Sequence, residues 1–126
     1  MTFQFFIHSL YGSALKDLEW CETHPLGGGY TGVLCMARSL RKLGHSVEII
    51  TDKNELWNHP CDVFILLQRW EVLRDSPGPG KLNYLWAMDD VNVPFTQDLS
   101  DPRIAEKVLQ HCDAVIVLSN YHLQRW

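Results

Sequence analysis

Residues 24–44, which read HPLGGGYTGVLCMARSLRKLG, decide the fold that the sequence predicts. The stretch opens with three successive glycines, and apolar residues then recur at spacings of three and four, as on one face of a helix. The apolar positions are Val33, Met36, Ala37, Leu40 and Leu43. Gly44 follows the last of them, where helices commonly end on a glycine with a left-handed backbone. The pattern therefore predicts a long helix that starts on a glycine loop and buries one face.

The N-terminus of such a helix is a candidate binding site. Its first amides find no acceptor within the helix and point outward, which suits phosphate or sugar oxygens. We therefore expect ligand contacts from the glycines and the two residues after them: Gly27, Gly28, Gly29, Tyr30 and Thr31. Thr31 has an equally good alternative role, because its hydroxyl can cap its own helix.

Five short stretches of β-forming residues alternate with helical patterns or connections along the chain. They are residues 3–9, 46–51, 62–67, 82–87 and 114–118. This alternation is typical of an α/β fold, a doubly wound, Rossmann-like parallel sheet covered on both faces, and we expect the strand order 3-2-1-4-5. The apolar run of the third strand indicates burial on both of its faces.

A second helix is expected near the C-terminal end of the chain. Asp101 is suited to the N-cap and Pro102 to the first helical position. We expect four apolar side chains of this helix to face inward: Ile104, Ala105, Val108 and Leu109. In such sheets ligands bind beyond the carboxyl ends of the strands, where the glycine loop, Asp52 and Ser119 would lie.

Composition restricts the class of protein. The 126 residues predict a single domain, and 46% of them are hydrophobic, which is enough for a core. The 11 Lys and Arg against 15 Asp and Glu leave no basic surface for nucleic acid. The four cysteines form no C-x-x-C pair, so we expect reduced thiols and a cytoplasmic location. We expect no signal peptide, membrane span, metal or cofactor.

The glycines also match a dinucleotide fingerprint. Gly27, Gly29 and Gly32 fit G-x-G-x-x-G, and Asp52 follows about 20 residues later at the end of a predicted strand. In that motif the glycines directly follow the first strand, whereas here residues 10–26 intervene. A stand-alone nucleotide- or dinucleotide-binding module of the oxidoreductase type is therefore the second hypothesis. A non-catalytic interaction domain with exposed tryptophans is the third.

Two segments carry a resemblance to a known family. Residues 27–51 read GGGYTGVLCMARSLRKLGHSVEIIT, and residues 112–126 read CDAVIVLSNYHLQRW. Together they resemble the N-terminal domain of a family 4, group 1 glycosyltransferase with the GT-B fold. The first segment fits that family's glycine pair, its helix and the strand that follows at Gly28, Gly29, Leu40, Gly44, His45, Val47 and Thr51.

The resemblance implies a retaining glycosyltransferase that transfers a sugar from a nucleotide-sugar donor to a sugar or lipid-linked acceptor. In that family the N-terminal domain faces the acceptor, and a second domain holds most of the donor. The chain would then be an incomplete GT-B N-terminal domain, inactive without a C-terminal donor-binding domain supplied in cis or in trans. Ser119, in the second segment, is a further candidate for binding.

The family often has a histidine in the loop after the fourth strand, and Met88 takes that place here. Asp89 and Asp90 follow it and are the candidate catalytic residues, for binding an acceptor hydroxyl or stabilising positive charge. Adjacent aspartates are also common turn formers. His8, at the end of the first strand, and Arg69, which follows the third, come within reach of the same edge. The sequence nevertheless favours a core position for His8 and a packing role for Arg69.

Overall fold

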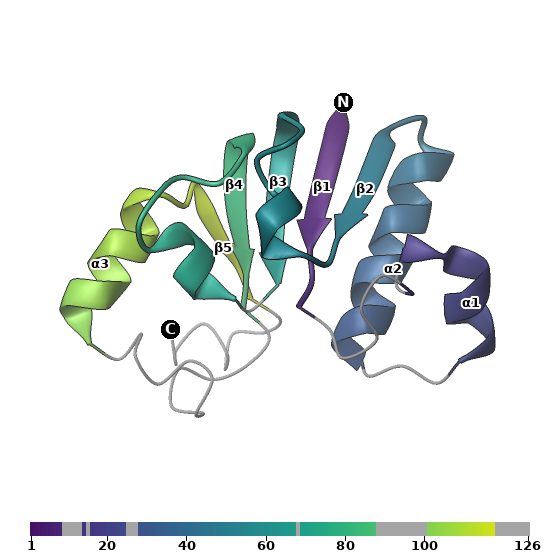
Figure 1. Cartoon of the computed structure of the whole chain (residues 1–126), viewed down its shortest axis with the longest axis horizontal. Coiled ribbons are helices and arrows are strands. Elements are labelled where there is room, and N and C mark those ends of the chain that lie inside the picture. The colour runs from purple at the N-terminus through teal and green to yellow at the C-terminus, as the bar shows by residue number, and fades with distance from the viewer. Residues whose placement is uncertain (9–13, 15, 25–27, 68, 88–100, 118–126) are drawn as a thin grey trace.

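The computed structural model describes residues 1–8, 14, 16–24, 28–67, 69–87 and 101–117. Five parallel strands form one sheet, with helices on both faces (Figure 1). The strands are β1 (Thr2–Phe6), β2 (Ser46–Ile50), β3 (Cys61–Leu67), β4 (Gly80–Trp86) and β5 (Ala114–Ile116). The helices are α1 (Leu18–Thr23), α2 (Gly28–Lys42) and α3 (Pro102–Gln110), with 3-10 turns η2 (Lys53–Glu55) and η3 (Trp70–Leu73). The predicted doubly wound α/β fold is confirmed.

The strand order is 2-1-3-4-5, so the predicted order 3-2-1-4-5 is wrong in the place of the third strand. β3 pairs with β1 on one side and with β4 on the other. Nearly all of its side chains are buried, which a strand at the centre of the sheet allows because both of its faces and both of its edges are covered. β2 exposes Ser46 and Glu48, as suits a strand at the edge of the sheet. The double burial indicated for residues 62–67 already argued for this central position.

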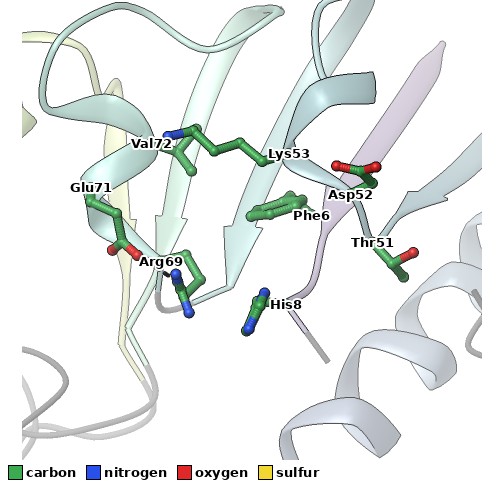
Figure 2. Close-up of a pocket in the computed structure, with 8 residues that line it drawn as sticks. All are labelled: Phe6, His8, Thr51, Asp52, Lys53, Arg69, Glu71 and Val72. Carbon is green, nitrogen blue, oxygen red and sulfur yellow. Dashed lines mark ion pairs between the residues drawn. The ribbon is translucent and has the colours of Figure 1, made fainter. Parts of the chain in front are cut away.

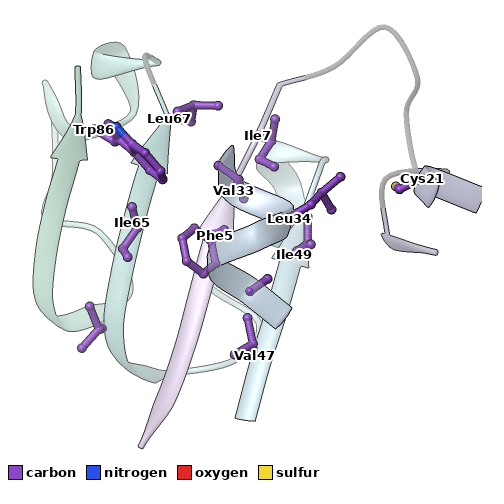
Figure 3. Packing of buried hydrophobic residues seen from close by; sticks show 12 residues of the cluster. Phe5, Ile7, Cys21, Val33, Leu34, Val47, Ile49, Ile65, Leu67 and Trp86 are labelled. Atoms are coloured by element: carbon purple, nitrogen blue, oxygen red, sulfur yellow. The ribbon is translucent and has the colours of Figure 1, made fainter. Parts of the chain in front are cut away.

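Two apolar cores cover the two faces of the sheet. Alternate residues of a strand point to opposite faces, so neighbours in the sequence enter different cores. Phe5 and Ile65 lie in the core beneath α2, whereas Phe6 and Leu66 lie in the core beneath η3 and α3. Figure 3 shows the first core, in which α2 packs across β1, β2 and β3.

The long helix α2 ends as its sequence predicts. Gly44 has φ of 90°, a left-handed conformation that glycine adopts without strain. The amide of Gly44 donates to the carbonyl of Arg41, and the amide of His45 donates to that of Leu40. These two bonds form a Schellman motif. The inward face is largely as predicted, except that Leu43 lies beyond the last helical residue and is 74% exposed.

The helix α3 begins as expected. The side chain of Asp101 accepts a hydrogen bond from the amide of Arg103 at 2.9 Å, and Pro102 takes the first position. Val108 is fully buried against η3, but Leu109 is 54% exposed. The prediction that Leu109 faces inward is therefore wrong, because only a narrow stripe of this short helix meets the sheet.

Candidate functional site at the β1–β3 switch point

The direction of the chain across the sheet reverses between β1 and β3. From β1 the chain passes through α2 on one face to β2, and it then returns past β1 on the other face to reach β3. Open α/β sheets bind ligands at such a switch point, beyond the carboxyl ends of the strands. A pocket of about 360 Å³ opens there (Figure 2). It is lined by Phe6, His8, Thr51, Asp52, Lys53, Arg69, Glu71 and Val72.

Three strand ends place the polar side chains of this switch-point pocket. His8 follows β1, Asp52 follows β2 and Arg69 follows β3. The carboxylate of Asp52 accepts from the amide of Asn54 at 2.9 Å and so caps η2. The amide of Arg69 donates to the carbonyl of Leu67 at 2.7 Å, which turns the chain sharply after β3. Local backbone bonds therefore hold these side chains at the pocket.

Several polar atoms in the pocket have unused hydrogen-bonding capacity. Arg69 uses Nε for an ion pair with Oε1 of Glu71. Within the described ranges, no hydrogen bond or ion pair engages its two terminal nitrogens, the second oxygens of Asp52 and Glu71, or the ammonium group of Lys53, which lies near enough to Asp75 to lower the pKa of that carboxyl. In Figure 2 the aminoalkyl chain of Lys53 extends across the pocket above Phe6 toward Val72. The pocket thus offers both donors and acceptors to a ligand.

His8 is exposed and lines the pocket, so its expected core position is wrong. Arg69 also faces the pocket instead of packing. Four further residues line the pocket that the sequence did not mark as site residues: Thr51, Lys53, Glu71 and Val72. The available signal was position alone, since these residues lie just after β2 and just after β3.

The start of α2 lies at the same edge of the sheet. Gly28 and Gly29 are its first two residues, so they form the first helical turn. The hydroxyl of Tyr30 donates to the carbonyl of His8 at 3.4 Å, which places that turn close to the end of β1. Thr31 is exposed and faces a separate cavity of about 100 Å³ against α1. The structure therefore does not bring Thr31 into the switch-point pocket.

The packing of Gly32 bears on the dinucleotide hypothesis. In the dinucleotide motif the third glycine allows the helix to approach the sheet closely. A Cβ at Gly32 would lie 3.7 Å from Cη2 and 3.9 Å from Cζ2 of Trp86, which are ordinary contacts. Packing therefore does not require glycine at this position. Asp52, in contrast, follows β2 next to the end of β1, as that motif demands.

Four of the predicted site residues lie outside the described residues: Gly27, Asp89, Asp90 and Ser119. Of the tryptophans that the structure describes, Trp70 and Trp86 are buried, Trp20 is half-buried and Trp57 is 49% exposed, so the expected surface of several exposed tryptophans is not seen among them. In the described part of the chain, no three His, Cys, Asp or Glu side chains are grouped to hold a metal ion.

The helices in the described ranges are all too short or too polar to cross a membrane. Comparisons of the chain with protein-family models, with curated proteins and with solved structures find no match. The site is therefore interpreted from its own geometry.

Proposed function

We propose that the chain is the N-terminal, acceptor-side part of a retaining glycosyltransferase. This enzyme would transfer a sugar from a nucleotide-sugar donor to a sugar or lipid-linked acceptor, with a donor-binding domain supplied in cis or in trans. The observation that carries the proposal is the switch-point pocket, where three strand ends present donors and acceptors beside the start of a long helix.

The start of α2 and the switch-point pocket lie at the same edge of the sheet and suit different reactants. The start of α2 suits the donor diphosphate, because the helix dipole favours negative charge there. The pocket beyond β1, β2 and β3 mixes both charges and suits the acceptor. Asp89 and Asp90 keep their proposed role at the acceptor hydroxyl, and Ser119 its proposed role in binding.

The donor part of the proposal is tested with the Thr31→Asp variant. Thr31 is exposed in the first turns of α2, and a carboxylate there stabilises the helix dipole while it repels phosphate. A titration with nucleotide-diphosphate sugars, followed by amide NMR shifts, should show binding at residues 28–31. Thr31→Asp should weaken it about tenfold, a loss of ~1.4 kcal/mol.

Ser39→Asp is the matched control, since Ser39 is exposed late in the same helix, far from its N-terminus. If wild type, Thr31→Asp and Ser39→Asp bind the nucleotide-diphosphate sugar with equal affinity, the start of α2 is not part of the donor site. Absence of any shift at residues 28–31 with nucleotide-diphosphate sugars would contradict the proposal for this chain.

The position of Asp52 supports a second candidate, a nucleotide- or dinucleotide-binding module. An acidic residue after β2 is where the ribose hydroxyls of NAD are bound in such modules. Parallel titrations with NAD and a nucleotide-diphosphate sugar separate the two functions. Asp52→Asn keeps the cap of η2, because asparagine caps as well as aspartate, and removes only the charge. NAD binding that is tighter than sugar-nucleotide binding and is lost in Asp52→Asn would reverse the ranking.

A further inference from the structure

We propose that the switch-point pocket binds a neutral hydroxylated ring, a single monosaccharide unit of the acceptor, in preference to a phosphate group. The inference deepens the proposed function and rests on it, because it names the chemical class that the acceptor side recognises. It is argued from the charge balance, the open hydrogen-bonding atoms and the shape of the pocket.

The charges that line the pocket cancel. Lys53 and Arg69 supply two positive charges, and Asp52 and Glu71 supply two negative charges. A phosphate site instead concentrates positive charge or helix N-termini around the anion. Here any anion that approached Arg69 would also approach the carboxylate of Glu71, which is paired with it. The pocket therefore offers little net attraction to phosphate.

Interleaved donors and acceptors suit hydroxyl groups, because each hydroxyl both donates and accepts hydrogen bonds. The guanidinium nitrogens of Arg69 and the ammonium of Lys53 donate only, whereas the carboxylates of Asp52 and Glu71 accept only. These groups come from opposite sides of the pocket, Asp52 and Lys53 after β2, and Arg69 and Glu71 after β3. A ring with hydroxyls around its rim can satisfy both sides together.

The floor and the size of the pocket agree with a small ring. Two apolar side chains line the pocket, Phe6 and Val72, which are 3% and 4% exposed, and Figure 2 shows the Lys53 side chain passing above the ring of Phe6. The small apolar surface that they leave open suits the C–H face of a sugar ring. The volume of about 360 Å³ lies near the lower end of the range for ligand pockets, ~300–1,000 Å³. That size favours one ring over an extended dinucleotide.

The test titrates the 126-residue chain with methyl glucoside, methyl mannoside and myo-inositol, and separately with inorganic phosphate and glucose 6-phosphate. Amide NMR shifts report both the affinity and the place of binding. We expect the neutral rings to shift the resonances of residues 51–53 and 69–72. The phosphate group of glucose 6-phosphate should add no affinity over the neutral sugar.

Two variants and their matched controls locate the contacts. Asp52→Asn and Arg69→Gln should each weaken binding of the neutral ring about tenfold or more, because each removes a charged hydrogen-bonding group. Asp101→Asn and Arg103→Gln should leave binding unchanged. Asp101 caps a helix as Asp52 does, and Arg103 is held in an ion pair as Arg69 is, but both control residues lie outside the pocket.

Each outcome decides the inference. Binding of inorganic phosphate in the pocket without binding of neutral rings would overturn it, as would neutral binding that both pocket variants leave unchanged. If neutral rings bind but nucleotide-diphosphate sugars do not, the inference stands and the proposed glycosyltransferase function is contradicted for this chain. If nucleotide-diphosphate sugars bind at α2 but neutral rings do not bind, the inference fails and the proposed function stands.

Discussion

Replacing Gly32 with alanine should stabilise the protein, although Gly32 occupies the third glycine position of a sequence that matches the dinucleotide fingerprint. Gly32 lies inside α2, where glycine is less favourable than alanine by ~0.8–1.0 kcal/mol because of its backbone entropy. The added methyl group would meet only ring carbons of Trp86, at 3.7 Å and 3.9 Å. We therefore expect the free energy of unfolding to rise by about 1 kcal/mol and the melting temperature by roughly 4 °C.

Urea unfolding followed by far-UV circular dichroism measures this change, with the slope against urea expected to stay constant. Gly80→Ala is the opposing control. A Cβ at Gly80 would collide with the carbonyl oxygen of Leu82 and lie 2.7 Å from the backbone nitrogen of Phe64. Because backbone atoms of β3 and β4 cannot move aside cheaply, Gly80→Ala should lower the free energy of unfolding by ~1–3 kcal/mol.

A destabilised Gly32→Ala variant would refute the reasoning. It would mean that α2 approaches β4 too closely at Trp86 to admit a methyl group, as in a dinucleotide-binding motif. The dinucleotide hypothesis would then regain the support that the packing of Gly32 removes.

Two further predictions concern titratable groups away from the pocket. The Thr2 amide hydrogen bond, aided by Lys81, lowers the pKa of Asp62 to about 2, so the ionised carboxylate stabilises the folded state. This contribution is complete above the ordinary pKa of ~3.9 and is lost as the pH falls toward 2. Asp62→Asn should therefore lower stability at neutral pH and flatten its fall between about pH 4 and pH 2, as measured by urea unfolding at a series of pH values. Burial raises the pKa of Cys61 to about 11, so iodoacetamide at pH 8 should alkylate exposed Cys35 first and Cys61 only after unfolding, as peptide mass spectrometry will show.

The local elements follow from the sequence because their signals are local. The left-handed Gly44, the Asp101 cap and the apolar stripe of α2 each depend on residues a few positions apart. Leu109 was misplaced because helical periodicity defines a face but not how much of it meets the sheet. The strand order failed for a related reason, since pairing is a contact between distant segments, and only the double burial of β3 carried information about it.

The candidate site was predictable only in its location. The rule that ligands meet parallel sheets at the carboxyl ends of strands points to the edge where the pocket with His8, Asp52 and Arg69 lies. The sequence could not show that β3 lies beside β1, and so it did not bring the residues after β2 and β3 together around Phe6. The ion pair between Arg69 and Glu71, which lie on the same side of the pocket, depends on the turn after β3.

The division between buried strands and exposed strand ends has a consequence for how the pocket can change. Phe5, Phe6 and Leu66 fix the geometry of the sheet from within, whereas His8 and Asp52 extend into solvent just beyond it. Exchanging these outer side chains, with the Asp52 cap of η2 retained, would change the chemistry of the pocket lining and leave the contacts of both cores in place. The lining can therefore diversify, by mutation or by design, at little cost to folding.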